Sequence, residues 1–177
     1  YEEVVLMTAS LARLLRQSIS NEDEVVPLAR EVEYAKGYLT IQKMRYKDKL
    51  EFEIDVEPSI LNIPLIKLVL QPIIENAIYH GLKYKESKGL LQVKGFMKDG
   101  NAVLQVIDNG VGMDEETLSH IYDKHKVNYH SNGVGVYNVQ KRLKLYYGEN
   151  YGITYESEKD VGTTATITIP GIQEESI

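Results

Sequence analysis

Five consecutive residues combine a carboxylate with two glycines, a pattern that brings backbone close to a ligand. Asp108-Asn109-Gly110-Val111-Gly112 follows an apolar run. Glycine lacks a Cβ and accepts positive φ, so the main chain can approach a bound group closely. A carboxylate can accept a hydrogen bond from the exocyclic amine of adenine, whereas guanine presents a carbonyl there. In isolation, the five residues also fit an ordinary turn.

An asparagine in an expected helix supplies a second candidate ligand. Asn76, Tyr79 and His80 stand at i, i+3 and i+4, so a helix places them on one face. The amide oxygen of Asn76 is a hard, neutral ligand that Mg²⁺ accepts beside water and phosphate oxygens. The alternative is a plain helix end with His80-Gly81 as its C-cap.

Two further glycine-containing stretches complete the set. Gly133-Val134-Gly135 opens an amphipathic helix that includes Val136, and N–H groups at a helix N-terminus can bind phosphate. Gly162-Thr163 enters a β-branched strand, where Thr163 would support the nucleotide wall or Asp108. Each stretch also fits a plain loop, but four such elements in this order favour a nucleotide site. The stretch Gly133-Val134-Gly135 matches neither a P-loop nor a dinucleotide fingerprint.

The elements that position these residues follow from hydrophobic periodicity. Helical spacing predicts helices over 2–19, 27–46, 64–80 and 136–147, the last closed by Gly148. Alternation predicts strands over 50–56, 90–97, 102–107, 153–157 and 164–169, with a hairpin turn at 98–101. Asn21 and Glu24 predict the cap of the second helix. Pro72 either kinks the third helix or marks its true start.

Strands that follow helices, joined by antiparallel hairpins, indicate an α+β fold. We expect a two-layer α/β sandwich with a mixed, mostly antiparallel sheet, preceded by N-terminal helices. Residues 113–132 show no strand pattern and are predicted to hold one short helix capped by Asp114, within a mobile loop. The last residues, 172–177, are expected to form a polar tail.

Composition restricts the class of protein. The chain has 177 residues, 43% of them hydrophobic, and no cysteine, which rules out disulfides and thiolate metal sites. The net charge of −6 argues against nucleic acid as a partner. No segment approaches the roughly 20 apolar residues of a membrane span.

Together these motifs resemble a known ATP-binding family. Asn76, Asp108-x-Gly110-x-Gly112, Gly133-x-Gly135 and Gly162-Thr163 look like the N, G1, G2 and GT boxes of the Bergerat-type fold. Gyrase-type topoisomerases, mismatch-repair ATPases, heat-shock chaperones and sensor histidine kinases share this fold. Four phrases are most similar to sensor histidine kinases of the LytS/YesM type: LARLLRQS (11–18), YLTIQKMRY (38–46), QPIIENAIYHG (71–81) and GVYNVQKRLKLYYG (135–148).

The resemblance implies a nucleotide site and a phosphorelay. ATP with Mg²⁺ would lie between the Asn76 helix and a lid at 113–132. The implied nucleotide contacts are Asn76, His80, Asp108, Gly110, Gly112, Gly133, Val134, Gly135, Val136 and Thr163. Asn76 would also ligate the metal. The γ-phosphate would pass to a histidine upstream of Tyr1, and then to an aspartate of a response regulator. None of the four histidines here sits in an acceptor motif, so this stretch should bind ATP without phosphorylating itself.

Three positions depart from the family pattern. Tyr79 stands where the family often has a phosphate-contacting Lys, and Lys83, one turn later, is a candidate substitute. Val136 replaces a usual Leu. Pro72 occupies the position where hydrolytic relatives carry a catalytic Glu, which favours a kinase over a gyrase-type or mismatch-repair ATPase. A non-catalytic nucleotide-binding signalling module stays open as another alternative.

The resemblance also implies a domain plan. Residues 1–20 would end a dimerisation hairpin, 21–48 would form a connecting helix, and 49–171 would form the ATP-binding domain. The implied partners are the chain's own dimerisation and phospho-acceptor domain, a response regulator, and a second copy in a full-length homodimer. A cytoplasmic domain of a membrane-anchored sensor is the expected setting.

Overall fold

A computed structural model describes residues 24–121 and 133–171. Five strands form one sheet in the order β2-β4-β5-β7-β6. Its members are β2 (Leu50–Val56), β4 (Gly89–Lys98), β5 (Asn101–Asp108), β6 (Gly152–Glu158) and β7 (Gly162–Pro170). β2 pairs with β4 in parallel and the other neighbours are antiparallel. The mixed, mostly antiparallel sheet and the α+β class are thereby confirmed.

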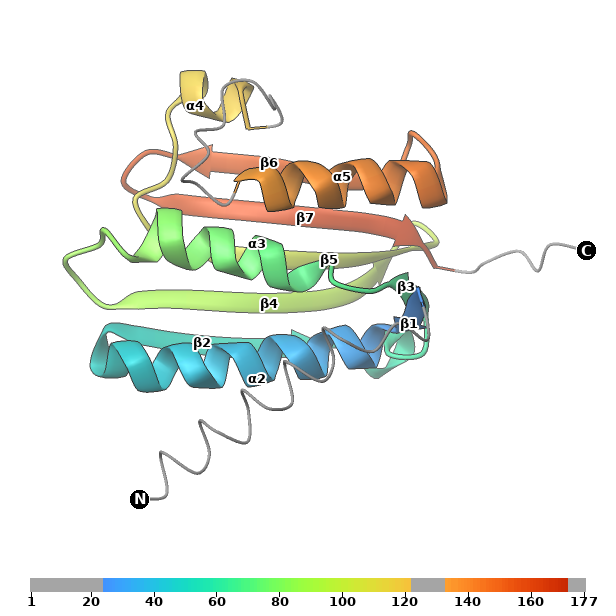
Figure 1. Cartoon of the computed structure of the whole chain (residues 1–177), viewed down its shortest axis with the longest axis horizontal. Helices are drawn as coiled ribbons and strands as arrows, with labels where there is room; N and C mark the ends of the chain where they lie inside the picture. Colours follow the sequence, from blue (N-terminus) through green and yellow to red (C-terminus); the bar gives the residue numbers. More distant parts are fainter. Residues whose placement is uncertain (1–23, 122–132, 172–177) are drawn as a thin grey trace, which may run out of the picture.

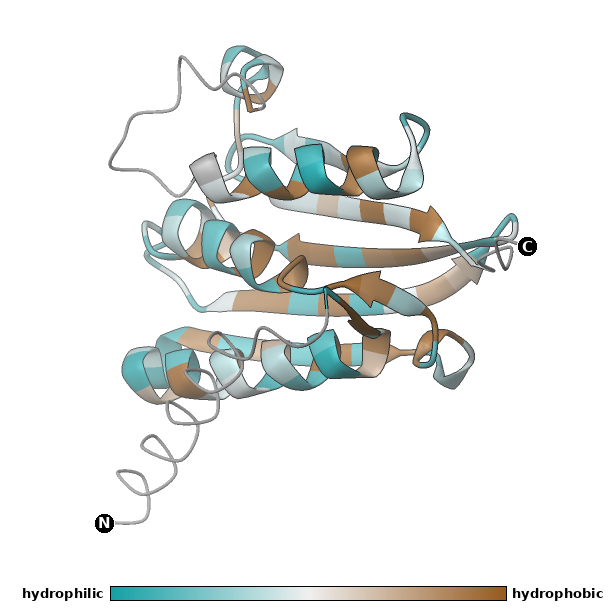
Figure 2. Ribbon diagram, turned by 45° about the vertical axis from the view of Figure 1, so that its right-hand side comes forward, coloured by the Kyte–Doolittle hydropathy of each residue, from teal (hydrophilic) through white to brown (hydrophobic). Residues whose placement is uncertain are grey.

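Helices cover one face of this sheet, which makes the molecule two layers thick (Figure 1). They are α2 (Leu28–Tyr46), α3 (Leu70–Asn76) with its continuation η3 (Ala77–Leu82), and α5 (Gly133–Tyr147). Short 3-10 turns, η1 (Lys47–Lys49) and η2 (Pro58–Ile60), flank β2. Apolar residues gather where the helices face the sheet (Figure 2), and Leu39, Ile74 and Leu143 are fully buried there. Burying this apolar surface is the main force that joins the two layers.

Local sequence signals placed most strands well. Alternation at 50–56 matches β2, and the β4–β5 hairpin turns at Asp99 and Gly100, both with positive φ (51° and 77°). Such a turn matches the right-handed twist of the paired strands. α5 ends as predicted, where the N–H of Gly148 donates to the Lys144 carbonyl at 2.9 Å. The short helix after Asp114 is present as α4 (Glu115–Ser119), and the Asp114 side chain caps it.

One predicted helix start is wrong, and one predicted helix cap is not seen. β1 (Val25–Pro27) and β3 (Pro64–Ile66) form a separate antiparallel pair, so residues 64–66 are a strand rather than the start of a helix. α2 begins at Leu28, one residue from its predicted start, and its N-cap residue, Pro27, has no side-chain cap. Glu24 therefore does not cap it, and Asn21, the other residue of the predicted cap, lies outside the described residues. Three-residue strands pair through contacts far apart in sequence, and local periodicity does not reveal them.

Pro72 marks a helix start, which was one of its two predicted roles. It is the third residue of α3, where its missing N–H costs no intrahelical hydrogen bond. The helix then continues beyond residue 80 as the wider turns of η3, in which the N–H of Lys83 donates to the Ile78 carbonyl at 2.8 Å. Such wide turns often occur at functional sites.

The predicted domain plan concerns several segments outside the described residues: 1–20, most of the lid, and the tail. α2 belongs to the same layer as α3, and its Leu28 and Leu39 join the common core. In the described part of the chain, no helix combines the length and apolarity needed to cross a bilayer.

Candidate nucleotide-binding site

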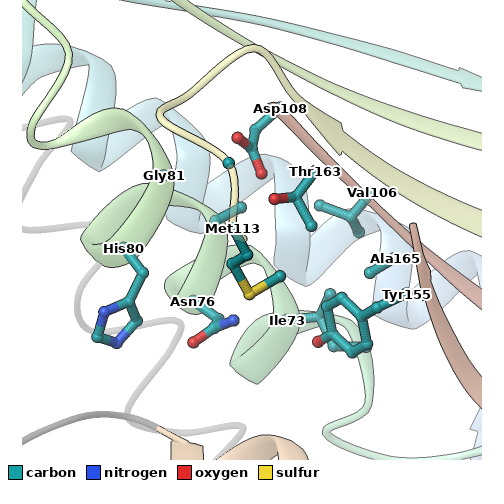
Figure 3. A pocket seen from close by; sticks show the side chains of 12 residues that line it. Ile73, Asn76, His80, Gly81, Val106, Asp108, Met113, Tyr155, Thr163 and Ala165 are labelled. Carbon is teal, nitrogen blue, oxygen red and sulfur yellow. The ribbon is translucent and has the colours of Figure 1, made fainter. Parts of the chain in front are cut away.

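A pocket lies between α3–η3 and the sheet, and two sets of side chains line it (Figure 3). We call the first set the strand wall: Val106, Asp108, Tyr155, Thr163 and Ala165. We call the second set the helix wall: Ile73, Asn76, Ala77, His80 and Gly81. Gly112 and Met113 close the pocket from the loop that follows β5.

The strand wall is built by sheet register. Asp108 lies opposite Thr163, and Val106 lies opposite Ala165, across the β5–β7 pair. Tyr155 on β6 lies opposite the same Ala165. Because alternate residues of a strand point to one face, these side chains share the face that the helices cover. The wall therefore offers one carboxylate and the hydroxyls of Thr163 and Tyr155 beside the apolar Val106 and Ala165.

Asp108 is the only carboxylate among the described residues that line this pocket, and it is 5% exposed. Its Oδ1 accepts the N–H of Gly110 at 2.8 Å, and the backbone N–H of Thr163 also donates to the carboxylate. Burial raises the pKa of Asp108 to about 6, against the opposing effects of these two N–H groups and of Lys85. The carboxylate is thus ionised at neutral pH and held in a fixed orientation, as an acceptor for a ligand amine must be.

The two glycines that follow Asp108, Gly110 and Gly112, allow neighbouring chain segments to pack closely as well as leaving room for a ligand. A Cβ on Gly110 would collide with the backbone of Gly81 on η3, so this glycine lets the loop meet the helix. The N–H of Val111 then donates to the Gly81 carbonyl at 3.1 Å. Gly112 has φ of 62°, and a Cβ there would collide with the carbonyl oxygen of Glu158. Gly112 lines the pocket, whereas Gly110 acts through the chain packing behind it.

The helix wall presents the predicted Asn76 and His80 to the pocket. Asn76 is the last residue of α3, and its amide is partly exposed on the pocket side (Figure 3). Desolvation, followed by the nearby Lys83 cation, lowers the pKa of His80 and so favours its neutral imidazole. A neutral imidazole beside an amide offers polar contact without charge.

Tyr79 and Lys83 do not belong to the described residues that line the pocket. Tyr79 faces α2, where it hydrogen-bonds Arg45 and thereby raises the pKa of that guanidinium. The Nζ of Lys83 lies 5.8 Å from the centroid of the Tyr79 ring. Neither predicted phosphate contact therefore lines the pocket in this structure: Tyr79 lies toward α2, and Lys83 lies near Tyr79 and His80.

The stretch Gly133-Val134-Gly135 begins α5, as the sequence predicted. α5 starts at Gly133, although the side chain of Val134 lies outside the described residues. Val136 is only 1% exposed and belongs to the core, so any contact it makes to a ligand is through its backbone. A Cβ on Gly135 would lie 3.4 Å from Cβ of Pro72, so α5 meets α3 closely here.

The sequence did not single out several of the residues that line the pocket. For some of them, the two-residue period of a strand would have predicted their place beside a predicted site residue. Val106 lies two residues before Asp108, and Ala165 lies two residues after Thr163, so each shares its strand face with a predicted residue. Tyr155 carries no such signal, because only the β6–β7 register brings it to the site.

Ser157 is a further unforeseen residue, at the base of the lid. Its Oγ accepts the N–H of Met113 at 2.8 Å, lies 2.8 Å from the hydroxyl of Thr163, and donates to the Gly162 carbonyl at 3.0 Å. One hydroxyl thus ties the first residue of the lid to the strand wall. The remainder of the predicted lid, 122–132, is outside the described residues, so its expected mobility stays a prediction.

A divalent cation bound here would take some of its ligands from phosphate and water rather than from the described protein side chains. Among residues 24–121 and 133–171, no cluster of three His, Asp or Glu side chains is placed to hold a metal ion. The Asn76 amide in the helix wall suits a Mg²⁺ ion that keeps phosphate and water ligands, which is the usual mode for Mg²⁺ with nucleotides.

Comparison with known proteins identifies the family of this fold. The model of the histidine kinase-, DNA gyrase B-, and HSP90-like ATPase family matches residues 62–173, and a histidine kinase model matches residues 1–50. Sensor histidine kinase YesM of Bacillus subtilis is 32% identical over 169 residues, covering 96% of this chain. Sensor protein LytS of Oceanobacillus iheyensis is 31% identical over 163 residues, covering 90%. The chain spans 28% of the length of each of these two relatives.

Solved structures show the same fold. The catalytic domain of histidine kinase ThkA superposes with a TM-score of 0.64 at 14% identity, covering 84% of this chain and 99% of that domain. The histidine kinase domain of the blue-light activated kinase from Erythrobacter litoralis gives a TM-score of 0.59 at 16% identity, covering 96% and 75%.

The fold and the pocket define a class of ATP-binding domains. The chain belongs to the histidine kinase-, DNA gyrase B-, and HSP90-like ATPase family, and it is similar to sensor histidine kinases over nearly its whole length.

Proposed function

We propose that this chain binds Mg²⁺-ATP in the pocket between the strand wall and the helix wall, and serves as the catalytic portion of a sensor histidine kinase. One observation carries the proposal: Asn76, Asp108 and Thr163, distant in sequence, line one pocket. Asp108 would accept the adenine amine, the floor of Val106 and Ala165 would contact the ring, and Asn76 would face the phosphates.

Each group would have a distinct task in phosphoryl transfer. Asp108 and the floor would hold the base, while Asn76 and the start of α5 would orient the triphosphate. Mg²⁺ would neutralise phosphate charge. An imidazole nitrogen of a histidine in the dimerisation domain would attack the γ-phosphorus, the bond to the β–γ bridging oxygen would break, and ADP would leave. The phosphoryl group would then pass to an aspartate of a response regulator.

Water is a poorer acceptor in this site than in hydrolytic relatives. Pro72, whose side chain has no proton-accepting group, is the residue of α3 one turn before Asn76. Activating water requires a general base within hydrogen-bond reach. We therefore propose transfer to a protein histidine rather than hydrolysis, within a larger homodimeric sensor anchored in a membrane.

Calorimetric titration with Mg²⁺-ATP and Mg²⁺-GTP tests the binding step. We expect ATP to bind more tightly, because guanine would place a carbonyl oxygen against the Asp108 carboxylate. Equal affinity for the two nucleotides would refute the role of Asp108 in base selection.

A longer chain that includes the upstream residues tests the transfer step. After incubation with ATP labelled at the γ-phosphate, we expect a label that is stable to base and labile to acid, as a phosphohistidine is. Binding without such a label would support the non-catalytic signalling module. Steady release of phosphate by residues 1–177 alone would support a hydrolytic ATPase.

A further inference from the structure

The helix that carries Asn76 has no N-terminal cap of its own. α3 begins at Leu70, and its N-cap, Val69, has no side-chain acceptor. The preceding residues Lys67 and Leu68 also lack the short polar side chains that usually cap helices. The first N–H groups of a helix need partners from elsewhere in the molecule.

Glu31, on α2, supplies those partners from 37 to 39 residues away. Its Oε1 accepts the N–H of Leu68 at 2.7 Å, and its Oε2 accepts the N–H groups of Val69 at 2.9 Å and Leu70 at 3.1 Å. Glu31 is 2% exposed. Charge-assisted hydrogen bonds in a buried setting are stronger and more directional than neutral ones.

The same short segment is held from two other sides. Nη2 of Arg142, on α5, donates to the Lys67 carbonyl at 2.8 Å, and the Lys67 N–H donates to the Glu24 carbonyl at 2.9 Å. Leu68 has φ of 61°, a conformation that leucine adopts only where its surroundings enforce it. The Glu31 carboxylate helps to hold Leu68 in this conformation, because it accepts the Leu68 N–H directly.

Asn76 lies six residues after Leu70, about 9 Å along one helix. A helix moves largely as a unit, so a change at its first turn changes the position of Asn76. We infer that Glu31 is a positioning residue for the metal-and-phosphate side of the site: it fixes the start of α3 and so the direction of the Asn76 amide. The inference rests on the proposed binding of Mg²⁺-ATP.

Glu31→Gln tests this role, because it keeps the side-chain length and removes the charge. A glutamine has one acceptor oxygen, so it cannot serve both oxygen positions of Glu31. The measurement is the ratio of ATP affinity with Mg²⁺ to ATP affinity in EDTA. We expect this ratio to fall roughly tenfold, the usual lower range when a residue that supports a metal ligand is changed. Affinity in EDTA should change less than the ratio, since Asp108 stands on β5.

Two control variants separate positioning from general stability. Glu33→Gln makes the same chemical change on the exposed side of α2. Ile169→Ala removes a fully buried side chain from β7, at the end of the sheet remote from Asp108. Both controls should leave the Mg²⁺ ratio unchanged, although Ile169→Ala lowers the melting temperature.

The outcomes distinguish this inference from the proposed function. A wild-type chain that does not bind Mg²⁺-ATP would refute the proposed function. A wild-type chain that binds, beside a folded Glu31→Gln variant with an unchanged Mg²⁺ ratio, would refute only the role of Glu31. If Glu31→Gln is unfolded by circular dichroism, Glu31→Asp takes its place. It keeps the charge but is one methylene shorter, and an unchanged ratio there also refutes the role.

Discussion

The two walls of the pocket are held in different ways. In the strand wall, Asp108 and Thr163 face each other through the β5–β7 ladder, and Asp108 is fixed by N–H groups of the same two segments. In the helix wall, Asn76 depends on a helix whose start is fixed by Glu31 from α2 and Arg142 from α5. The strand wall is thus held within one sheet, whereas the helix wall depends on the packing of three helices.

We therefore expect mutations in the two walls to change ATP binding in different ways. Changes in the strand wall should affect base binding whether or not Mg²⁺ is present. Changes at the start of α3 should act mainly on the part of ATP affinity that Mg²⁺ provides.

Gly112→Ala should have the largest effect, by disrupting the loop that follows β5 and adjoins the strand wall. A Cβ at φ of 62° would be strained and would collide with the Glu158 carbonyl oxygen. We expect a loss of about 3 kcal/mol in the free energy of unfolding, combining backbone strain and steric overlap. Urea denaturation measures it. Gly100→Ala is the matched control, because Gly100 also has positive φ (77°) but has open space around it. Equal losses for the two variants would show that the contact with Glu158 is unimportant.

Asp108→Ala should weaken ATP binding by about 1.5–3 kcal/mol, the typical value of a hydrogen bond to a charged group. This corresponds to roughly 10–150-fold in affinity. The loss should be similar in Mg²⁺ and in EDTA, because Asp108 belongs to the strand wall. Calorimetry provides the measurement, and Asp55→Ala, an exposed carboxylate on β2, provides the control. Normal ATP binding by Asp108→Ala would mean that the base lies elsewhere.

The affinity for ATP should also rise with pH through the titration of Asp108. Burial raises its pKa to about 6, so at pH 5 about one carboxylate in ten is ionised, and affinity should be roughly tenfold lower than at pH 7. Asp108→Asn should lose this dependence while retaining any that comes from ATP itself. A wild-type profile identical to that of the variant would contradict the assignment.

The same titration has a defined effect on stability. The ordinary pKa of an aspartate is 3.8, so between about pH 4 and pH 6 the native state keeps a proton that the unfolded state has released. The contribution of Asp108 to stability therefore falls as pH rises through this window. Comparing the unfolding free energies of wild type and Asp108→Asn across the window measures this contribution.

Arg142→Ala should have the smallest effect, and it examines the helix wall. Loss of the hydrogen bond to the Lys67 carbonyl should cost about 1 kcal/mol of stability. It should also lower the Mg²⁺-dependent part of ATP affinity by a few-fold. Lys141→Ala, an exposed change on the same helix, serves as the control. A loss of affinity that is equal with and without Mg²⁺ would remove the distinction between the two walls.

The sequence predicts elements with a local pattern well, and it predicts contacts between distant segments poorly. Alternation placed β2 at its observed residues and came close for β5, since each pattern is local. The pairing of Val25–Pro27 with Pro64–Ile66 was missed, because each strand is three residues long and its partner is distant. In the sequence, Glu31 is one of several charged residues of the helix predicted over 27–46. Its burial is decided only by where α2 lies against the start of α3.

The sequence by itself determined the residue types of the proposed nucleotide site, the order of its motifs and the strands next to Asp108 and Thr163, because glycine pairs, caps and alternation are local physical signals. Tertiary structure decided which of these residues meet in one pocket, turned Tyr79 toward α2, and assigned Gly110 to chain packing. It also gave the Asn76 helix its cap from Glu31, since hydrogen bonds between distant segments form only when the whole chain packs.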